Sequence, residues 1–153
     1  MRKIKRIPVT REGYEKLKSD LNELKLLRPA AVNTLSDARK MGDLSENGLY
    51  TAAKMRLKSI DAQIFRLNIQ IKLADIIEKK TDGVVGINTK VKISDGKKER
   101  DLHIVGQYEA DPLNNKISNS SPIGRALIGR KVGDIVNVYT PSGKVNYKVL
   151  KIS

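Results

Sequence analysis

Residues 41–48 read Met-Gly-Asp-Leu-Ser-Glu-Asn-Gly and separate two runs of apolar residues at heptad spacing. The first run occupies positions 14, 17, 21, 24, 28, 31, 35 and 38, where Arg28 alone is not apolar. The second run occupies positions 50, 53, 57, 60, 64, 67, 71 and 74, and every member is apolar. Each run lasts about four heptads, the length typical of a coiled coil. The glycines and capping residues between them favour a tight reversal, so residues 1–80 predict an antiparallel helical hairpin with its tip at 42–47.

The composition changes near residue 81, which indicates a second domain. Residues 1–80 contain 11 Leu, 2 Val and 3 Gly, whereas residues 81–153 contain 4 Leu, 9 Val and 8 Gly. Leucine-rich sequence with few glycines favours helices, and valine with glycine favours strands and turns. We therefore predict two domains, a helical hairpin over 1–80 and a strand-rich domain over 81–153, and an α+β fold overall.

Turn and cap signals divide the second domain into elements. Thr89–Ser94 predicts a strand, Asp95-Gly96 a hairpin turn, and Asp101–Val105 the return strand. Ser121-Pro122 predicts the start of a short helix that Gly129 ends. Strands over 134–140 and 144–152 would form a second hairpin. These elements predict a small antiparallel sheet with one helix.

The composition of the whole chain excludes several classes of function. Thirty basic and 17 acidic residues give a net charge of +13, which favours a polyanionic partner. Aromatic residues make up only 4%, which excludes a base-stacking platform. There is no cysteine and one histidine, so thiolate chemistry and a multi-histidine metal site are excluded. No apolar run is long enough to cross a membrane and no signal peptide is apparent, so we expect a cytoplasmic protein.

Asp43 and Glu46 place two carboxylates at the predicted tip of the hairpin. Carboxylates are hard oxygen ligands suited to Mg²⁺, although two of them alone would hold the ion weakly. The same spacing fits a capping box, in which Asp43 caps the second helix and Glu46 reaches back. The residues alone leave both interpretations open, and a capping carboxylate keeps lone pairs for a metal.

Two blocks of sequence resemble the bacterial Gre transcript-cleavage factors of the GreA/GreB type. The first block is Asp37–Asn47, reading DARKMGDLSEN, with Tyr50 and Ala52-Ala53-Lys54 after it. The second comprises DLHIVG at 101–106, EAD at 109–111, IS at 117–118, SPIGRALIG at 121–129 and VGD at 132–134. The blocks lie on both predicted domains and in the same order as in that family.

The resemblance implies a fold, a partner and a reaction. It implies an N-terminal coiled-coil hairpin and a C-terminal domain of FKBP-like fold that docks on RNA polymerase. The hairpin would enter the secondary channel of the polymerase and bring Asp43 and Glu46 to its active centre. There these residues would help to hold a second Mg²⁺ and promote cleavage of the backtracked nascent RNA at its 3′ end. The protein would be a monomer, with no enzymatic activity and no stably bound cofactor of its own.

Other residues have more than one possible role. Arg11, Lys18 and Lys25 recur every seven residues, so they would share one helix face. This basic stripe either contacts RNA or the channel wall, or is an ordinary solvated face. Within the second block, we predict that Ser121, Pro122, Ile123, Gly124 and Arg125 contribute to polymerase docking.

Three other functions are alternatives to transcript cleavage. An inhibitory channel-binding protein would not need both Asp43 and Glu46. A peptidyl-prolyl isomerase needs an aromatic-lined pocket, and residues 81–153 contain no Phe or Trp. A long coiled-coil dimer that binds nucleic acid is disfavoured by the glycine-flanked break.

Overall fold

A computed structural model describes residues 5–42, 47–80 and 82–153. The chain divides into two compact units. One contains Glu15–Leu73, and the other combines residues 1–14 with Ala74–Ser153. Among the described residues, no helix combines the length and the apolar character needed to span a bilayer.

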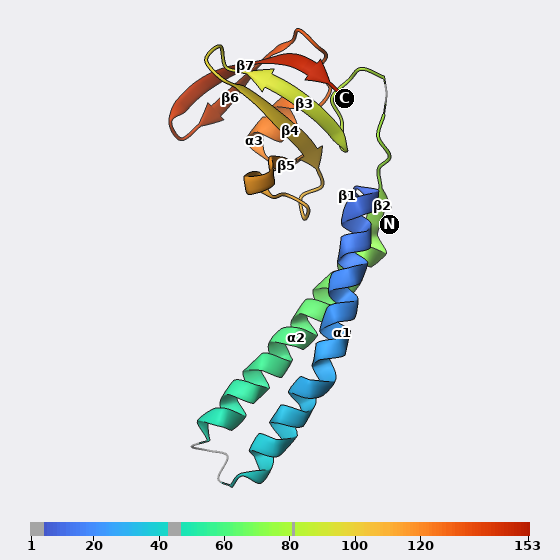
Figure 1. Cartoon of the computed structure of the whole chain (residues 1–153), viewed down its shortest axis with the longest axis vertical. Coiled ribbons are helices and arrows are strands. Elements are labelled where there is room, and N and C mark those ends of the chain that lie inside the picture. Colours follow the sequence, from blue (N-terminus) through green and yellow to red (C-terminus); the bar gives the residue numbers. More distant parts are fainter. Residues whose placement is uncertain (1–4, 43–46, 81) are drawn as a thin grey trace. The chain divides into compact units, whose positions relative to one another are not determined.

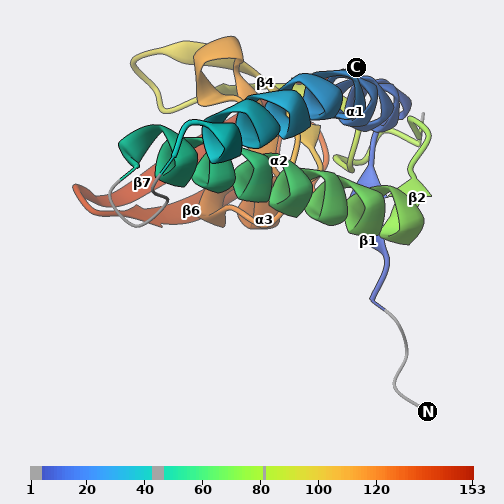
Figure 2. The same ribbon diagram turned by 90° about the horizontal axis from the view of Figure 1, so that it is seen from below.

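Two long helices form the hairpin, called the arm below. Helix α1 spans Arg11–Lys40 and helix α2 spans Gly48–Leu73, and they run side by side in opposite directions (Figures 1 and 2). The buried apolar side chains between them all come from the predicted heptad positions. They are Leu17, Leu21, Ala31, Ala38, Ala53 and Ile60. The heptad pattern therefore located the seam of the hairpin, and the predicted coiled coil is confirmed.

Arg28, the polar residue in the heptad pattern, bridges the two helices. Its Nε donates to Asp61 Oδ1 at 2.6 Å and its Nη2 donates to Asp61 Oδ2 at 3.3 Å. This hydrogen bond and the charge of Asp61 raise the pKa of Arg28 above its ordinary value. This exposed bidentate pair links α1 to α2 at one position along the seam. Pro29 follows directly, and α1 continues through it to Lys40.

A short parallel strand pair holds the two ends of the arm together at its base. Strand β1 spans Ile7–Val9 and strand β2 spans Ala74–Ile76, with Pro8 opposite Asp75. Val9 is fully buried, and its carbonyl accepts from the Ile77 N–H at 2.8 Å. Neither strand has a sequence pattern long enough to predict it.

The second domain, called the sheet domain below (residues 82–153), contains a five-stranded sheet in the order β5-β4-β3-β7-β6. The strands are β3 Thr89–Ser94, β4 Glu99–Val105, β5 Lys116–Ser118, β6 Ile135–Thr140 and β7 Gly143–Ile152. Neighbouring strands are antiparallel, except that β5 is parallel to β4 at the edge. The two predicted strand hairpins are confirmed, and β5 is an addition.

The sheet curls around one short helix, α3, which spans Pro122–Leu127 (Figure 1). A one-turn 3₁₀ helix, η1, spans Pro112–Asn114 before β5. The apolar core between α3 and the sheet consists of Val85, Val91, Ile93, Leu102, Ile104, Leu127, Val136, Val138, Tyr147 and Val149. Along β3 and β6 buried and outward residues alternate, as expected for a sheet with one covered face. The arm and the sheet domain confirm the predicted α+β fold.

Candidate functional site

The reversal between the two helices is capped by Asn47. Its Oδ1 accepts from the Tyr50 N–H at 3.2 Å, and its Nδ2 donates to the Ala38 carbonyl at 3.0 Å. Asn47 is therefore the N-cap of α2 and also ties the start of α2 to the end of α1. The capping-box interpretation concerns Asp43 and Glu46, so it cannot be compared with this cap. Asp43 and Glu46 lie outside the described residues, so their metal role stays a prediction.

The described surroundings of the tip are basic and apolar. The guanidinium of Arg39 lies 6.0 Å from the centre of the Tyr50 ring, and Lys40 pairs with Asp37 at 3.5 Å. A hollow of about 350 Å³ lies between the helices behind the tip. It is lined by Thr34, Asp37, Ala38, Met41, Leu49, Ala52, Ala53 and Arg56. Tyr50, at a heptad position of α2, is half-buried, which agrees with a packing role.

The three residues of the predicted basic stripe have different surroundings. Arg11 pairs with Glu78 at 3.4 Å, and Lys18 pairs with Glu15 at 2.9 Å. Lys25 is exposed and has no acidic partner among the residues that the structure describes. Exposed ion pairs contribute little to stability, so they leave Arg11 and Lys18 able to exchange partners. Lys25 has the greatest freedom to meet an anion.

The stretch 121–125, predicted to dock on polymerase, serves the fold at several positions. The Ser121 hydroxyl accepts from the Gly124 N–H at 3.1 Å and donates to the Ser118 carbonyl at 2.7 Å, so it caps α3. A Cβ at buried Gly124 would overlap the same carbonyl oxygen. Pro122 and Arg125 are exposed, which leaves these two side chains available to a partner.

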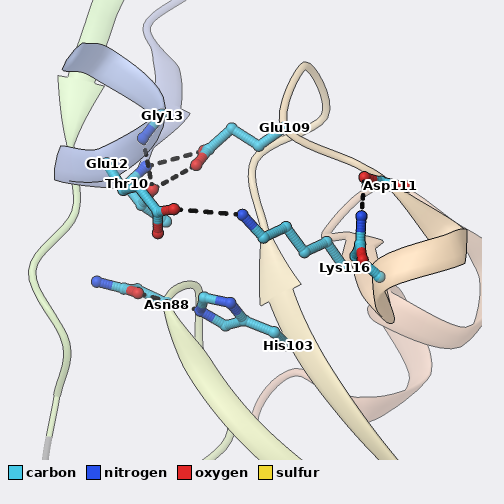
Figure 3. A network of polar contacts seen from close by, with 9 residues as sticks. Thr10, Glu12, Gly13, Asn88, His103, Glu109, Asp111 and Lys116 are labelled. Carbon is cyan, nitrogen blue, oxygen red and sulfur yellow. Dashed lines mark hydrogen bonds and ion pairs between the residues drawn. The ribbon is translucent and has the colours of Figure 1, made fainter. Parts of the chain in front are cut away.

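His103, the one histidine of the chain, is partly buried and contacts another side chain of the sheet domain. Its Nε2 lies 3.2 Å from Asn88 Oδ1 (Figure 3). Burial, followed by the charges of Lys90 and Lys116, lowers the pKa of His103 below its ordinary value of 6.5, although Glu12 and Glu109 act in the opposite direction. Among the described residues, no group of three or more His, Asp or Glu is placed to hold a metal ion.

The lowered pKa of His103 predicts a pH effect on the sheet domain. As pH falls below about 6.5, the unfolded chain binds a proton at this site before the folded chain does, so stability declines. Chemical denaturation between about pH 7.5 and pH 5.5 should show this decline in the unmodified chain. His103→Gln should decline less over the same range. Equal slopes for both chains would contradict this assignment.

Comparisons with known proteins agree with this architecture. The family model described as "Transcription elongation factor, N-terminal" matches residues 7–76, and the model described as "Transcription elongation factor, GreA/GreB, C-term" matches residues 80–153. The first range includes both strands at the base of the arm, and the second includes the whole sheet domain.

Similar proteins cover nearly the whole chain. Transcription elongation factor GreA of Thermodesulfovibrio yellowstonii is 42% identical over 153 residues, with 97% of both chains covered. The GreA factor of Lactococcus lactis subsp. cremoris (strain SK11) is 44% identical over 154 residues, covering 97% of this chain and 98% of that one. Among solved structures, the GreA factor homolog Gfh1 of Thermus thermophilus is 30% identical, with 97% and 99% covered and a TM-score of 0.46.

The fold is that of a two-part protein in which a helical hairpin is joined to a small α+β domain. With both family models matched in order and full-length relatives above 40% identity, the family follows. The chain belongs to the GreA/GreB family of transcription elongation factors.

Proposed function

We propose that this protein binds bacterial RNA polymerase and stimulates the polymerase to cleave backtracked nascent RNA. The observation that carries the proposal is the arm, whose two helices of 30 and 26 residues end in a sequence with two carboxylates. At about 1.5 Å per residue such helices reach roughly 40 Å or more, far enough for a narrow tip to enter a deep channel. The sheet domain would dock outside the secondary channel, and the protein would act as a monomer in the cytoplasm.

Asp43 and Glu46 would contribute oxygen ligands in the polymerase active centre. Their donor type fits Mg²⁺, and the described part of the chain offers no further cluster of ligands. The remaining ligands would therefore come from the polymerase. A second Mg²⁺ held in this way would stabilise the charge that develops on the phosphate during hydrolysis. The carboxylates of this chain would also orient the attacking water.

A cleavage assay with purified components tests this function. Stalled elongation complexes with labelled RNA should release short 3′ fragments much faster when the protein is added. The protein without polymerase should leave the same RNA intact, because two carboxylates do not make a complete metal site. Rapid cleavage of free RNA by the protein alone would contradict the proposal. So would an unchanged cleavage rate in the elongation complexes.

The basic stripe predicts a dependence on the length of extruded RNA. If Arg11, Lys18 and Lys25 contact that RNA, replacing all three by Gln should slow cleavage most in complexes with long backtracks. The loss should shrink as salt increases, since counterion release drives such contacts. Because Lys25 is exposed and unpaired among the described residues, Lys25→Gln should account for much of the effect. Equal losses on short and long backtracks would instead indicate contact with the channel wall, and no loss a solvated face.

A further inference from the structure

Glu109, in the loop after β4, places its carboxylate against the N-terminus of α1 (Figure 3). The Thr10 N–H donates to Glu109 Oε2 at 2.9 Å, and the Thr10 hydroxyl donates to Oε1. The same hydroxyl accepts from the Gly13 N–H at 3.0 Å, which makes Thr10 the N-cap of α1. Glu109 Oε2 also accepts from the Gly106 N–H at 3.2 Å. The carboxylate thus lies at the positive end of the helix dipole with three donors around it.

Two buried glycines make room for this contact. A Cβ at Gly13 would overlap the Glu109 carboxyl carbon, and a Cβ at Gly106 would overlap the Pro8 carbonyl oxygen. Neither glycine has a positive φ, so space rather than backbone conformation accounts for them. Glycine is a poor helix former, and its place in the first turn of α1 is explained by the carboxylate beside it.

The other acidic residue near this turn, Glu12, does not make an equivalent contact. Glu12 lies in the same helical turn and pairs with Lys116 at 3.5 Å, but about three quarters of the Glu12 side chain is exposed. An exposed pair of this kind contributes little. Thr10, by contrast, is 3% exposed, so its donors depend on Glu109 for partners.

We infer that Glu109 is a positioning residue that fastens the first turn of the arm to the sheet domain. It acts through Thr10, and Gly13 is small so that the carboxylate can reach that residue. Its consequence at the polymerase rests on the proposed function. A factor that docks with one domain and acts with the tip of another gains affinity when the joint between them is restrained before binding.

Spin labels can report the restraint directly, because the chain contains no cysteine. We would label Asn33→Cys on α1 and Asn137→Cys on β6, two exposed positions, and measure the distance distribution by pulsed electron resonance. The variants are Glu109→Ala, the isosteric Glu109→Gln, and Gly13→Ala. Glu12→Gln is the matched control. Circular dichroism would confirm that each chain is folded.

Glu109→Ala should broaden the distribution, Glu109→Gln should broaden it less, and Glu12→Gln should leave it unchanged. Gly13→Ala should broaden it as Glu109→Ala does, since the added methyl group displaces the end of a flexible side chain. Combined with Glu109→Ala, Gly13→Ala should have no additional effect. The Thr10 amide should exchange with solvent about tenfold faster once its charged acceptor is removed.

Unchanged distributions for both Glu109→Ala and Gly13→Ala would overturn the inference. Further broadening by Gly13→Ala in the Glu109→Ala chain would overturn it as well, because the glycine would then serve another contact. In the cleavage assay, Glu109→Ala should raise the half-saturating concentration and keep the rate at saturation. If the unmodified protein does not stimulate cleavage at all, the proposed function is wrong. The spin-label result still tests the positioning role of Glu109.

Discussion

A chain carrying both Asp43→Asn and Glu46→Gln is expected to lose stimulation of RNA cleavage by orders of magnitude while its arm stays folded. Amides keep the shape of the carboxylates but lack the negative charge that makes them good ligands for Mg²⁺. The fold should persist because Asn47 caps α2. Cleavage rates in stalled complexes and helix content by circular dichroism measure the two effects.

The matched control for the tip is Asp37→Asn. Asp37 is an exposed acid near the end of α1 that pairs with Lys40, so its replacement removes one negative charge from this end of the arm without touching the predicted ligands. It should reduce cleavage little. The double amide chain should still compete with the unmodified protein for polymerase, which separates docking from chemistry. Full stimulation by the double amide chain would show that these carboxylates are not needed.

The second large effect is expected for Gly124→Ala in the sheet domain. The added Cβ would overlap the Ser118 carbonyl oxygen, and backbone cannot move aside as a side-chain end can. Overpacking of this kind costs about 1–3 kcal/mol, and moving α3 would also disturb the Ser121 cap. Since α3 carries fully buried Leu127 into the core, the whole sheet domain should be affected. Its melting temperature should fall by roughly 10 °C.

Calorimetry of the full chain would measure this change, with Arg125→Gln as the control on the same helix. Arg125 is exposed, so its replacement should leave the melting temperature unchanged. If the stretch docks on polymerase as predicted, Arg125→Gln should weaken binding without loss of stability. A Gly124→Ala chain that melts like the unmodified protein would show that α3 can shift at little cost.

Elements with strong local signals could be predicted from the sequence. The heptad runs predicted the two helices of the arm because one face of each helix must be apolar along its whole length. Thr89–Ser94 was predicted with its observed bounds, and Ser121-Pro122 identified the start of α3. These signals are local, since periodicity and helix caps depend on residues within a few positions of one another.

Features that depend on distant residues could not be predicted in this way. Strands β1 and β2 have three residues each, too few to show a pattern of their own. Both helices of the arm separate them in the sequence. Thr10 and Glu109 are 99 positions apart, and only the folded chain brings them together. The cap at Asn47 depends on where α2 begins, and residue preferences leave that position open because several residue types cap well.

The β1–β2 pair makes the arm an insertion between two paired strands. The chain leaves β1 at Val9 and enters β2 at Ala74, so both helices lie between two fixed points. Whole heptads could then be added to α1 and α2 in equal number without changing the sheet domain or the pairing of β1 with β2. Each added heptad would advance the tip by about 10 Å and return it to nearly the same face. In this architecture the number of heptads sets the length of the arm, and that length can change independently of the sheet domain.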